Sequence, residues 1–177
     1  THSFDMENFP ISERKQRRGY MNIAYVGSLY AKQTPEFFLT ALKGLLEAGD
    51  VCAEHIKVSF TGYVEPRFEA LFSDRMLEKV VNYRGMCAHD EAVAIMQESD
   101  VLLLIVSTAR GKGNIPAKTL EYIGSGSSIL ALVPDGGDAA TLVSGFGGLV
   151  VPPEDIDRIQ AAIRQLYEQW QRGELNT

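Results

Sequence analysis

The 177-residue chain has the length and composition of one globular domain, since 45% of its residues are hydrophobic and 23% are charged. A formal net charge of −6 argues against a nucleic-acid-binding protein, which is normally basic. No apolar run approaches the ~20 residues that span a bilayer. Two cysteines, Cys52 and Cys87, are too few for a disulfide framework or a zinc site, and we expect both to be free thiols in the core.

The first twenty residues are polar and include the basic run 14–18. The opening Thr1-His2-Ser3-Phe4-Asp5 has neither an initiating methionine nor the pattern of a targeting signal. We therefore expect residues 1–20 to be an interdomain linker within a longer protein, and residues 21–177 to form the domain.

From residue 21 onward, short apolar runs alternate with segments of helical periodicity. The expected strands are 22–27, 56–63, 80–84, 101–106, 128–133 and 149–151. The expected helices are 34–49, 66–76, 90–99, 116–124, 138–144 and 154–171. Thr34 is the expected hydroxyl N-cap of the first helix, with Pro35 in its first turn. The strand 101–106 is almost wholly aliphatic, which is typical of a central parallel strand.

Six consecutive βα units predict an α/β fold. We expect a three-layer, Rossmann-like, doubly wound sheet of about six parallel strands in the order 3-2-1-4-5-6. In that order the winding reverses between the first and fourth strands, and ligands bind at the carboxyl ends of the strands beside the reversal. The loops 27–34 and 107–116 are therefore the expected binding loops.

The loop after the fourth strand contains glycines at Gly111 and Gly113 and cations at Arg110 and Lys112, before a helix that Pro116 would open. Backbone N–H groups at a positive helix end suit a phosphate. A surface turn, with glycines for conformation and cations for solubility, is an equal alternative.

Lys118 and Glu121 lie three residues apart, hence on one face of the helix that follows. A lysine in the first turn opposes the helix dipole, and lysine before glutamate is the weaker order for an ion pair. An anion at the helix start explains Lys118 better than helix stability does, with a surface salt bridge as the alternative. We place Glu121 about two turns in from that helix start.

The loop after the first strand offers a second set of candidates. Gly27 permits close approach of the backbone, Ser28 offers a hydroxyl, and Lys32 could reach an anion while facing Lys118; a solvated lysine is the alternative. The segment is not G-x-G-x-x-G, so the dinucleotide fingerprint is absent. Elsewhere, we expect a surface histidine at a helix start for His89 and a packing residue for Trp170.

Four segments, 25–32, 100–104, 116–126 and 147–155, resemble the C-terminal domain of the retaining group 1 glycosyltransferases (family 4), which have the two-domain GT-B fold. The segment Pro116-Ala117-Lys118-Thr119-Leu120-Glu121-Tyr122 is the most specific. The resemblance implies the donor-binding half of an enzyme that transfers a sugar from a UDP-, GDP- or other nucleoside-diphosphate sugar to a glycan, lipid or other acceptor with retention.

The resemblance also assigns roles to residues. Glu121 would bind the ribose hydroxyls, Lys32 and the helix start near Lys118 would bind the diphosphate, and the base would lie at 85–87. The expected nucleotide-sugar-binding residues are Gly27, Ser28, Lys32, Gly85, Met86, Cys87, Pro116, Ala117, Lys118, Thr119 and Glu121. Lys32 and Arg110 are the candidate catalytic cations, positioned to stabilise the charge of the leaving nucleoside diphosphate.

Two positions depart from the family pattern. Gly113 stands where many members have a glutamate that contacts the donor sugar, and Leu29 stands where arginine is common. A subgroup of the family with the same lysine–glutamate segment also lacks the first glutamate, so the resemblance to the family holds. The identity of the donor sugar is left open.

The resemblance further implies an acceptor-binding N-terminal domain in the same protein and no metal ion or other cofactor. It implies a cytoplasmic location and leaves open a peripheral association of the full-length enzyme with the inner face of the membrane. Two alternatives stay open: a GT-B sugar-nucleotide epimerase, and a non-catalytic Rossmann-like binding module.

Overall fold

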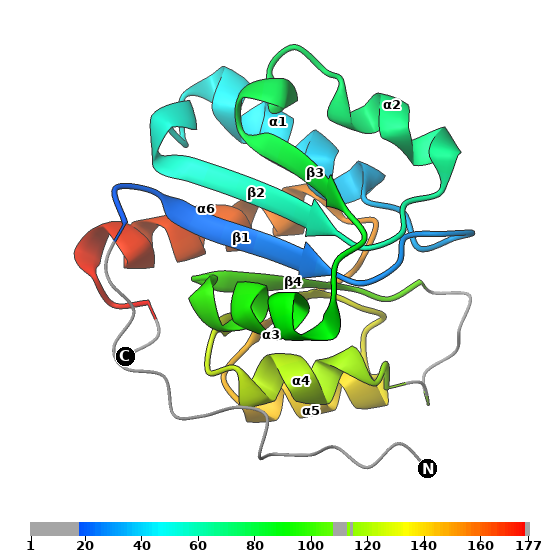
Figure 1. Cartoon of the computed structure of the whole chain (residues 1–177). Helices are drawn as coiled ribbons and strands as arrows, with labels where there is room; N and C mark the ends of the chain where they lie inside the picture. Colours follow the sequence, from blue (N-terminus) through cyan, green and yellow to red (C-terminus); the bar gives the residue numbers. More distant parts are fainter. Residues whose placement is uncertain (1–17, 108–112, 114, 176–177) are drawn as a thin grey trace.

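A single parallel sheet lies between two layers of helices in the computed structural model, which describes residues 18–107, 113 and 115–175 (Figure 1). The strands are β1 (Met21–Val26), β2 (Ile56–Thr61), β3 (Val81–Gly85), β4 (Val101–Ile105), β5 (Ser128–Leu132) and β6 (Leu149–Val151). Their order is β3-β2-β1-β4-β5-β6, and all neighbouring pairs are parallel. The fold class and strand order predicted from the sequence are confirmed. Residues 1–17 of the expected linker 1–20 lie outside the described residues.

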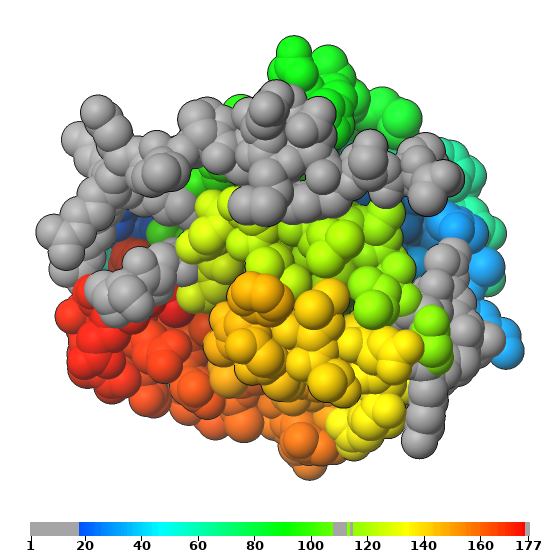
Figure 2. Space-filling model, turned by 90° about the horizontal axis from the view of Figure 1, so that it is seen from below, coloured from blue at the N-terminus to red at the C-terminus, as the bar shows by residue number. Residues whose placement is uncertain are grey.

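Helices cover both faces of the sheet. They are α1 (Glu36–Ala48), α2 (Glu69–Phe72), α3 (His89–Glu98), α4 (Lys118–Gly124), α5 (Asp138–Gly145) and α6 (Ile156–Arg172). One core cluster packs α1 and α6 against one face, and a second packs α3, α4 and α5 against the other. Figure 2 shows the second face, with α4 and α5 side by side. Within residues 18–107 and 115–175, no helix is both long and apolar enough to cross a membrane.

β4 is the central strand that its aliphatic sequence predicts. Leu103 and Ile105 belong to the core under α1 and α6, whereas Leu102 and Leu104 belong to the core under α3–α5. All four are buried. Trp170 packs against the first core and stacks on Tyr167, as expected of a packing residue.

The expected extent of one helix and the expected starts of two others are wrong. The helix expected at 66–76 is a 3-10 turn, Pro66–Phe68, followed by the single turn α2. The Asp74 carboxylate ends it, because it accepts the N–H groups of Met76 (2.9 Å) and Leu77 (3.4 Å) and starts a new 3-10 turn, Leu77–Lys79.

At the other two boundaries the helix begins later than the local signals suggest. The N-cap of α1 is Pro35 rather than Thr34, although the Thr34 hydroxyl still accepts the N–H of Glu36 at 3.2 Å. The N-cap of α4 is Ala117, so Pro116 precedes the helix instead of opening it. Cys52 is also exposed and not in the core.

Asp74 also joins the segment before β3 to α1, and this gives a pH-dependent prediction. Its carboxylate accepts a hydrogen bond from Lys43 Nζ at 2.6 Å. That bond, helped by the Met76 N–H, lowers the pKa of Asp74 below 3.8. A carboxyl group whose pKa is lowered by folding stabilises the fold above its unfolded pKa, and the contribution disappears as the pH falls through the folded pKa.

Asp74→Asn should therefore lower the melting temperature at pH 7 and make little difference once the pH lies below the folded pKa. Thermal unfolding of both proteins across this range is the measurement. Glu154→Gln, which replaces an exposed carboxylate, is the control and should melt like the wild type at each pH. A deficit in Asp74→Asn that persisted unchanged in acid would contradict this assignment.

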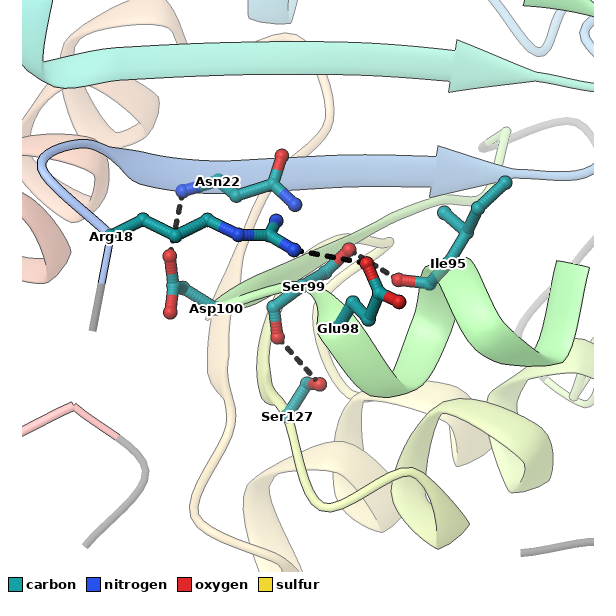
Figure 3. A network of polar contacts seen from close by, with 7 residues as sticks. All are labelled: Arg18, Asn22, Ile95, Glu98, Ser99, Asp100 and Ser127. Atoms are coloured by element: carbon teal, nitrogen blue, oxygen red, sulfur yellow. Dashed lines mark hydrogen bonds and ion pairs between the residues drawn. The ribbon is translucent and has the colours of Figure 1, made fainter. Parts of the chain in front are cut away.

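A network of polar contacts fixes the amino ends of the central strands (Figure 3). The Asp100 carboxylate accepts the N–H of Asn22 at 2.8 Å, which ties β1 to the start of β4. The hydroxyl of Ser127 donates to the carbonyl of Ser99 at 2.8 Å, and Arg18 pairs with Glu98 at 2.9 Å. These residues precede or begin their strands, so the network lies at the edge of the sheet opposite the expected binding loops.

Candidate functional site

The winding of the sheet reverses between β1 and β4, which are neighbours. The loop after β1 leads to α1 on one face, and the loop after β4 leads to α4 on the other. The two expected binding loops therefore leave the same edge in opposite directions, the arrangement in which doubly wound proteins hold ligands. Residues 108–112 and 114, including the candidate Arg110, lie outside the described residues.

Three glycines line the carboxyl edge on the β1 side. Gly27, Gly62 and Gly85 end or follow β1, β2 and β3, and their φ angles are 141°, 120° and 75°. Their backbones interlock: the N–H of Gly27 donates to the carbonyl of Thr61, and that of Gly62 to the carbonyl of Gly85, both at 2.8 Å. A Cβ on Gly62 would lie 2.1 Å from the carbonyl oxygen of Gly27. Sequence reasoning missed Gly62, whose signal was its place directly after a strand.

Lys118 reaches this edge from α4. Its Nζ donates to the hydroxyl of Tyr25 at 2.7 Å and lies 3.9 Å from the centroid of the Tyr25 ring. A Cβ on Gly27 would come within 3.1 Å of Nζ, so the absence of a side chain at Gly27 makes room for the ammonium. Among the described residues, Lys118 forms no ion pair with Glu121. Its partner is a tyrosine to which the sequence analysis gave no role.

The buried hydroxyl of Tyr25 also organises the loop after β1. It accepts a hydrogen bond from Nε2 of Gln33 and donates one to the backbone carbonyl of Ser28, both at 2.9 Å. Both ends of the loop 28–33 are thereby held to the same hydroxyl that holds Lys118. The structure shows a role for the Ser28 carbonyl, whereas the sequence analysis considered the Ser28 hydroxyl.

A second tyrosine joins α4 to β1. The hydroxyl of Tyr122 accepts the N–H of Val26 at 2.9 Å and donates to the Val26 carbonyl at 3.1 Å. Burial raises the pKa of Tyr122 far above its usual range, so the hydroxyl stays protonated and can keep donating. Tyr122 therefore joins α4 to the end of β1 through the backbone of Val26.

Glu121 lies in the first turn of α4, not two turns in as expected, because the helix begins at Lys118. Its side chain is half-buried, and no hydrogen bond or ion pair joins its carboxylate to the described residues. The Thr119 hydroxyl is buried without a partner among these residues. The N–H of Thr119 donates to the Pro116 carbonyl at 2.9 Å. This N–H is therefore already engaged within the turn that leads into α4.

Lys32 lies on an exposed part of the loop after β1. The loop beside it is anchored to the segment after β2. The N–H of Ala31 donates to the Glu65 carboxylate at 2.8 Å, and Arg67 donates to the Ala31 carbonyl. Ala31 has a φ of 53°, the left-handed region that costs a residue with a side chain. These contacts hold the loop that carries Lys32.

The segment expected to face the base follows β3. Met86 is 76% exposed, whereas Cys87 is half-buried against the core under α3–α5. Burial raises the pKa of the Cys87 thiol, which keeps it uncharged at neutral pH. His89 is an exposed residue at the start of α3, as expected. Gly85 and Met86 thus present backbone and a flexible apolar side chain at the carboxyl edge.

A cavity of about 260 Å³ lies elsewhere, between α3 and the face of β1–β3 that carries Asn22, Lys57 and Arg84. None of the candidate site residues lines it. Its cations are engaged: Arg84 pairs with Glu91 at 3.5 Å, and Lys57 donates to the carbonyl of Lys79 at 3.1 Å. In the described part of the chain, no group of three potential metal ligands comes together.

The parallel doubly wound sheet, with helices on both faces and a winding reversal between β1 and β4, is a Rossmann-like α/β domain. The sequence model of the family described as glycosyl transferases group 1 matches residues 21–169. The chain therefore belongs to the group 1 glycosyl transferases. No curated protein sequence matches it.

Three solved structures have a fold similar to that of this chain. WaaG, a glycosyltransferase involved in lipopolysaccharide biosynthesis, matches with a TM-score of 0.69 and 19% identity over 88% of this chain and 40% of its own. TarM matches with a TM-score of 0.73 and 12% identity over 98% of this chain and 32% of its own. The pneumococcal O-GlcNAc transferase GtfA, in complex with UDP and GlcNAc, matches with a TM-score of 0.64 and 14% identity over 94% and 33%. The chain thus spans two-fifths or less of these proteins.

Proposed function

We propose that this chain is the donor-binding half of a glycosyltransferase, which transfers a sugar with retention from a nucleoside-diphosphate sugar to an acceptor. The observation that carries the proposal is the ammonium of Lys118, held over the end of β1 where the winding reverses, with the carboxylate of Glu121 one turn further along α4. A cation beside a half-buried carboxylate that forms no hydrogen bond or ion pair with the described residues suits a diphosphate joined to a ribose.

The family assignment supports this proposal. The match covers most of the chain, and a structure of similar fold contains UDP. In the proposed complex, Glu121 binds the ribose hydroxyls, Lys32 and Lys118 bind the diphosphate, and the base lies against the backbone at Gly85 and Met86. The acceptor binds to a second domain of the full-length protein, which we place in the cytoplasm.

The chemistry asked of these residues is electrostatic. When the bond between the sugar and the diphosphate breaks, negative charge develops on the leaving nucleoside diphosphate. Cations already in place stabilise that charge without reorganising during the reaction. The proposal assigns this task to Lys118 and Lys32 and includes no metal ion.

Calorimetric titration of the chain with UDP, GDP and ADP tests the proposal. We expect one of these nucleotides to bind, and Lys118→Met to weaken it roughly 10- to 150-fold, the worth of one hydrogen bond to a charged group. Lys57→Met, which removes an exposed lysine on another part of the sheet, is the matched control and should bind like the wild type. If the chain binds none of the three nucleotides, the proposal fails and a binding module of another kind is the remaining interpretation.

The same chain should transfer no sugar by itself, because the acceptor half of a GT-B cleft belongs to another domain. To measure this, the chain is incubated with candidate acceptors and with the sugar derivative of the nucleotide that it binds. The products are then identified by mass spectrometry. Transfer by this chain alone would overturn the two-domain proposal. Conversion of the sugar nucleotide without any acceptor would identify an epimerase instead.

A further inference from the structure

The hydroxyl of Tyr25, which is fully buried, forms hydrogen bonds with three of the described residues, Lys118, Gln33 and Ser28. Lys118 and Gln33 contribute N–H donors only, so the Tyr25 oxygen accepts both bonds. The Ser28 carbonyl can only accept, so the Tyr25 proton points to it. The chemistry of the three partners thus fixes the orientation of the hydroxyl.

The position of Tyr25 explains why Lys118 lies at the winding reversal. Tyr25 belongs to the core under α1, whereas α4 packs on the opposite face of the sheet. The Lys118 side chain therefore crosses the carboxyl end of β1 to reach the Tyr25 hydroxyl. It passes over Gly27, where an added Cβ would lie 3.1 Å from Nζ and 3.5 Å from Cδ. The contact places a positive charge at the end of β1, where the winding reverses.

We propose that Tyr25 is a positioning residue of the donor site, which holds the Lys118 ammonium ready for the diphosphate of the donor. This inference rests on the proposed function. A lysine side chain loses considerable rotamer freedom when it binds a ligand. A lysine already held by the Tyr25 hydroxyl and ring loses less, which raises affinity for the ligand it meets.

The chain offers a matched control in Tyr122. Both tyrosines are fully buried, and the hydroxyl of each joins α4 to β1. Of these two hydroxyls, that of Tyr25 bonds Lys118, whereas that of Tyr122 bonds the backbone of Val26. Tyr25→Phe and Tyr122→Phe thus remove the same atom from similar surroundings, and a general loosening of the fold affects both variants.

The diphosphate increment, defined as the affinity for a nucleoside diphosphate divided by that for its nucleoside, is the readout. Calorimetry with UDP and uridine, or the pair whose diphosphate the wild type binds best, should show an increment about tenfold smaller in Tyr25→Phe. Tyr122→Phe should keep the wild-type increment. In a Lys118→Met background, Tyr25→Phe should cause no further loss.

The outcomes separate this inference from the proposed function. If no nucleotide binds to the wild type, the proposed function fails and the inference fails with it. If the wild type binds and Tyr25→Phe keeps the full increment, the inference alone fails. An equal loss in the Lys118→Met background would also overturn it, because Tyr25 would then act without Lys118.

A measurement without nucleotide tests the positioning directly. The side-chain ammonium protons of Lys118, assigned in NMR spectra by their loss in Lys118→Met, should exchange slowly with water in the wild type and in Tyr122→Phe. They should exchange faster in Tyr25→Phe. Exchange in the wild type as fast as that of the exposed Lys32 would overturn the inference.

Discussion

Replacing Glu121 with alanine is expected to weaken binding of the nucleoside diphosphate roughly 10- to 150-fold, the worth of hydrogen bonds from the ribose hydroxyls to a carboxylate. The variant should also lose its preference for ribose over dideoxyribose nucleotides. Its thermal stability should change little, because no described residue forms a hydrogen bond or ion pair with this carboxylate. Calorimetric titration of both proteins with both kinds of nucleotide is the measurement.

Two further variants sharpen this test. Glu121→Gln keeps an amide oxygen that can accept one hydrogen bond, so it should retain part of the ribose preference. Glu168→Ala removes an exposed carboxylate from α6, outside the candidate site, and should bind like the wild type. An unchanged ribose preference in Glu121→Ala would remove Glu121 from the site.

The fold could be predicted because its signals are local and repeated. The aliphatic run that became β4 and the six alternations of strand and helix left few topologies, and the observed order β3-β2-β1-β4-β5-β6 is the one expected. The same topology placed the two candidate binding loops on either side of the winding reversal. These inferences needed only periodicity, chain connectivity and the handedness of crossovers.

The errors came from contacts that join distant parts of the chain. The helix expected at 66–76 ends early because Asp74 caps the next turn and pairs with Lys43, 31 residues earlier. Lys118 and Tyr25 are 93 residues apart, and no spacing rule predicts that a lysine on one face of a sheet contacts a tyrosine from the other. Local helix signals placed Lys118 and Glu121 on α4, but only the structure gives the lysine its partner.

Gly62→Ala is expected to be the most destabilising single change at the carboxyl edge. The φ of 120° lies in a region that costs an alanine about 1–3 kcal/mol. The added Cβ would also lie 2.1 Å from the Gly27 carbonyl oxygen, and relieving such an overlap costs about 1–3 kcal/mol. The sum, about 2–6 kcal/mol, corresponds to a fall in melting temperature of roughly 4 to 24 °C for a domain of this size. Thermal unfolding measures it.

Gly49→Ala separates the two causes. Gly49 has a φ of 77° at the end of α1, but an added Cβ would meet nothing within 4 Å. This control should cost only the left-handed backbone strain, about 1–2 kcal/mol. The excess loss in Gly62→Ala then measures the close approach of the backbones after β1 and β2. Because relief of the overlap moves Gly27, over which Lys118 passes, the folded Gly62→Ala protein should also bind nucleoside diphosphate more weakly than Gly49→Ala. Equal stability and equal binding in the two variants would show that the Gly27–Gly62 contact neither constrains the edge nor supports the site.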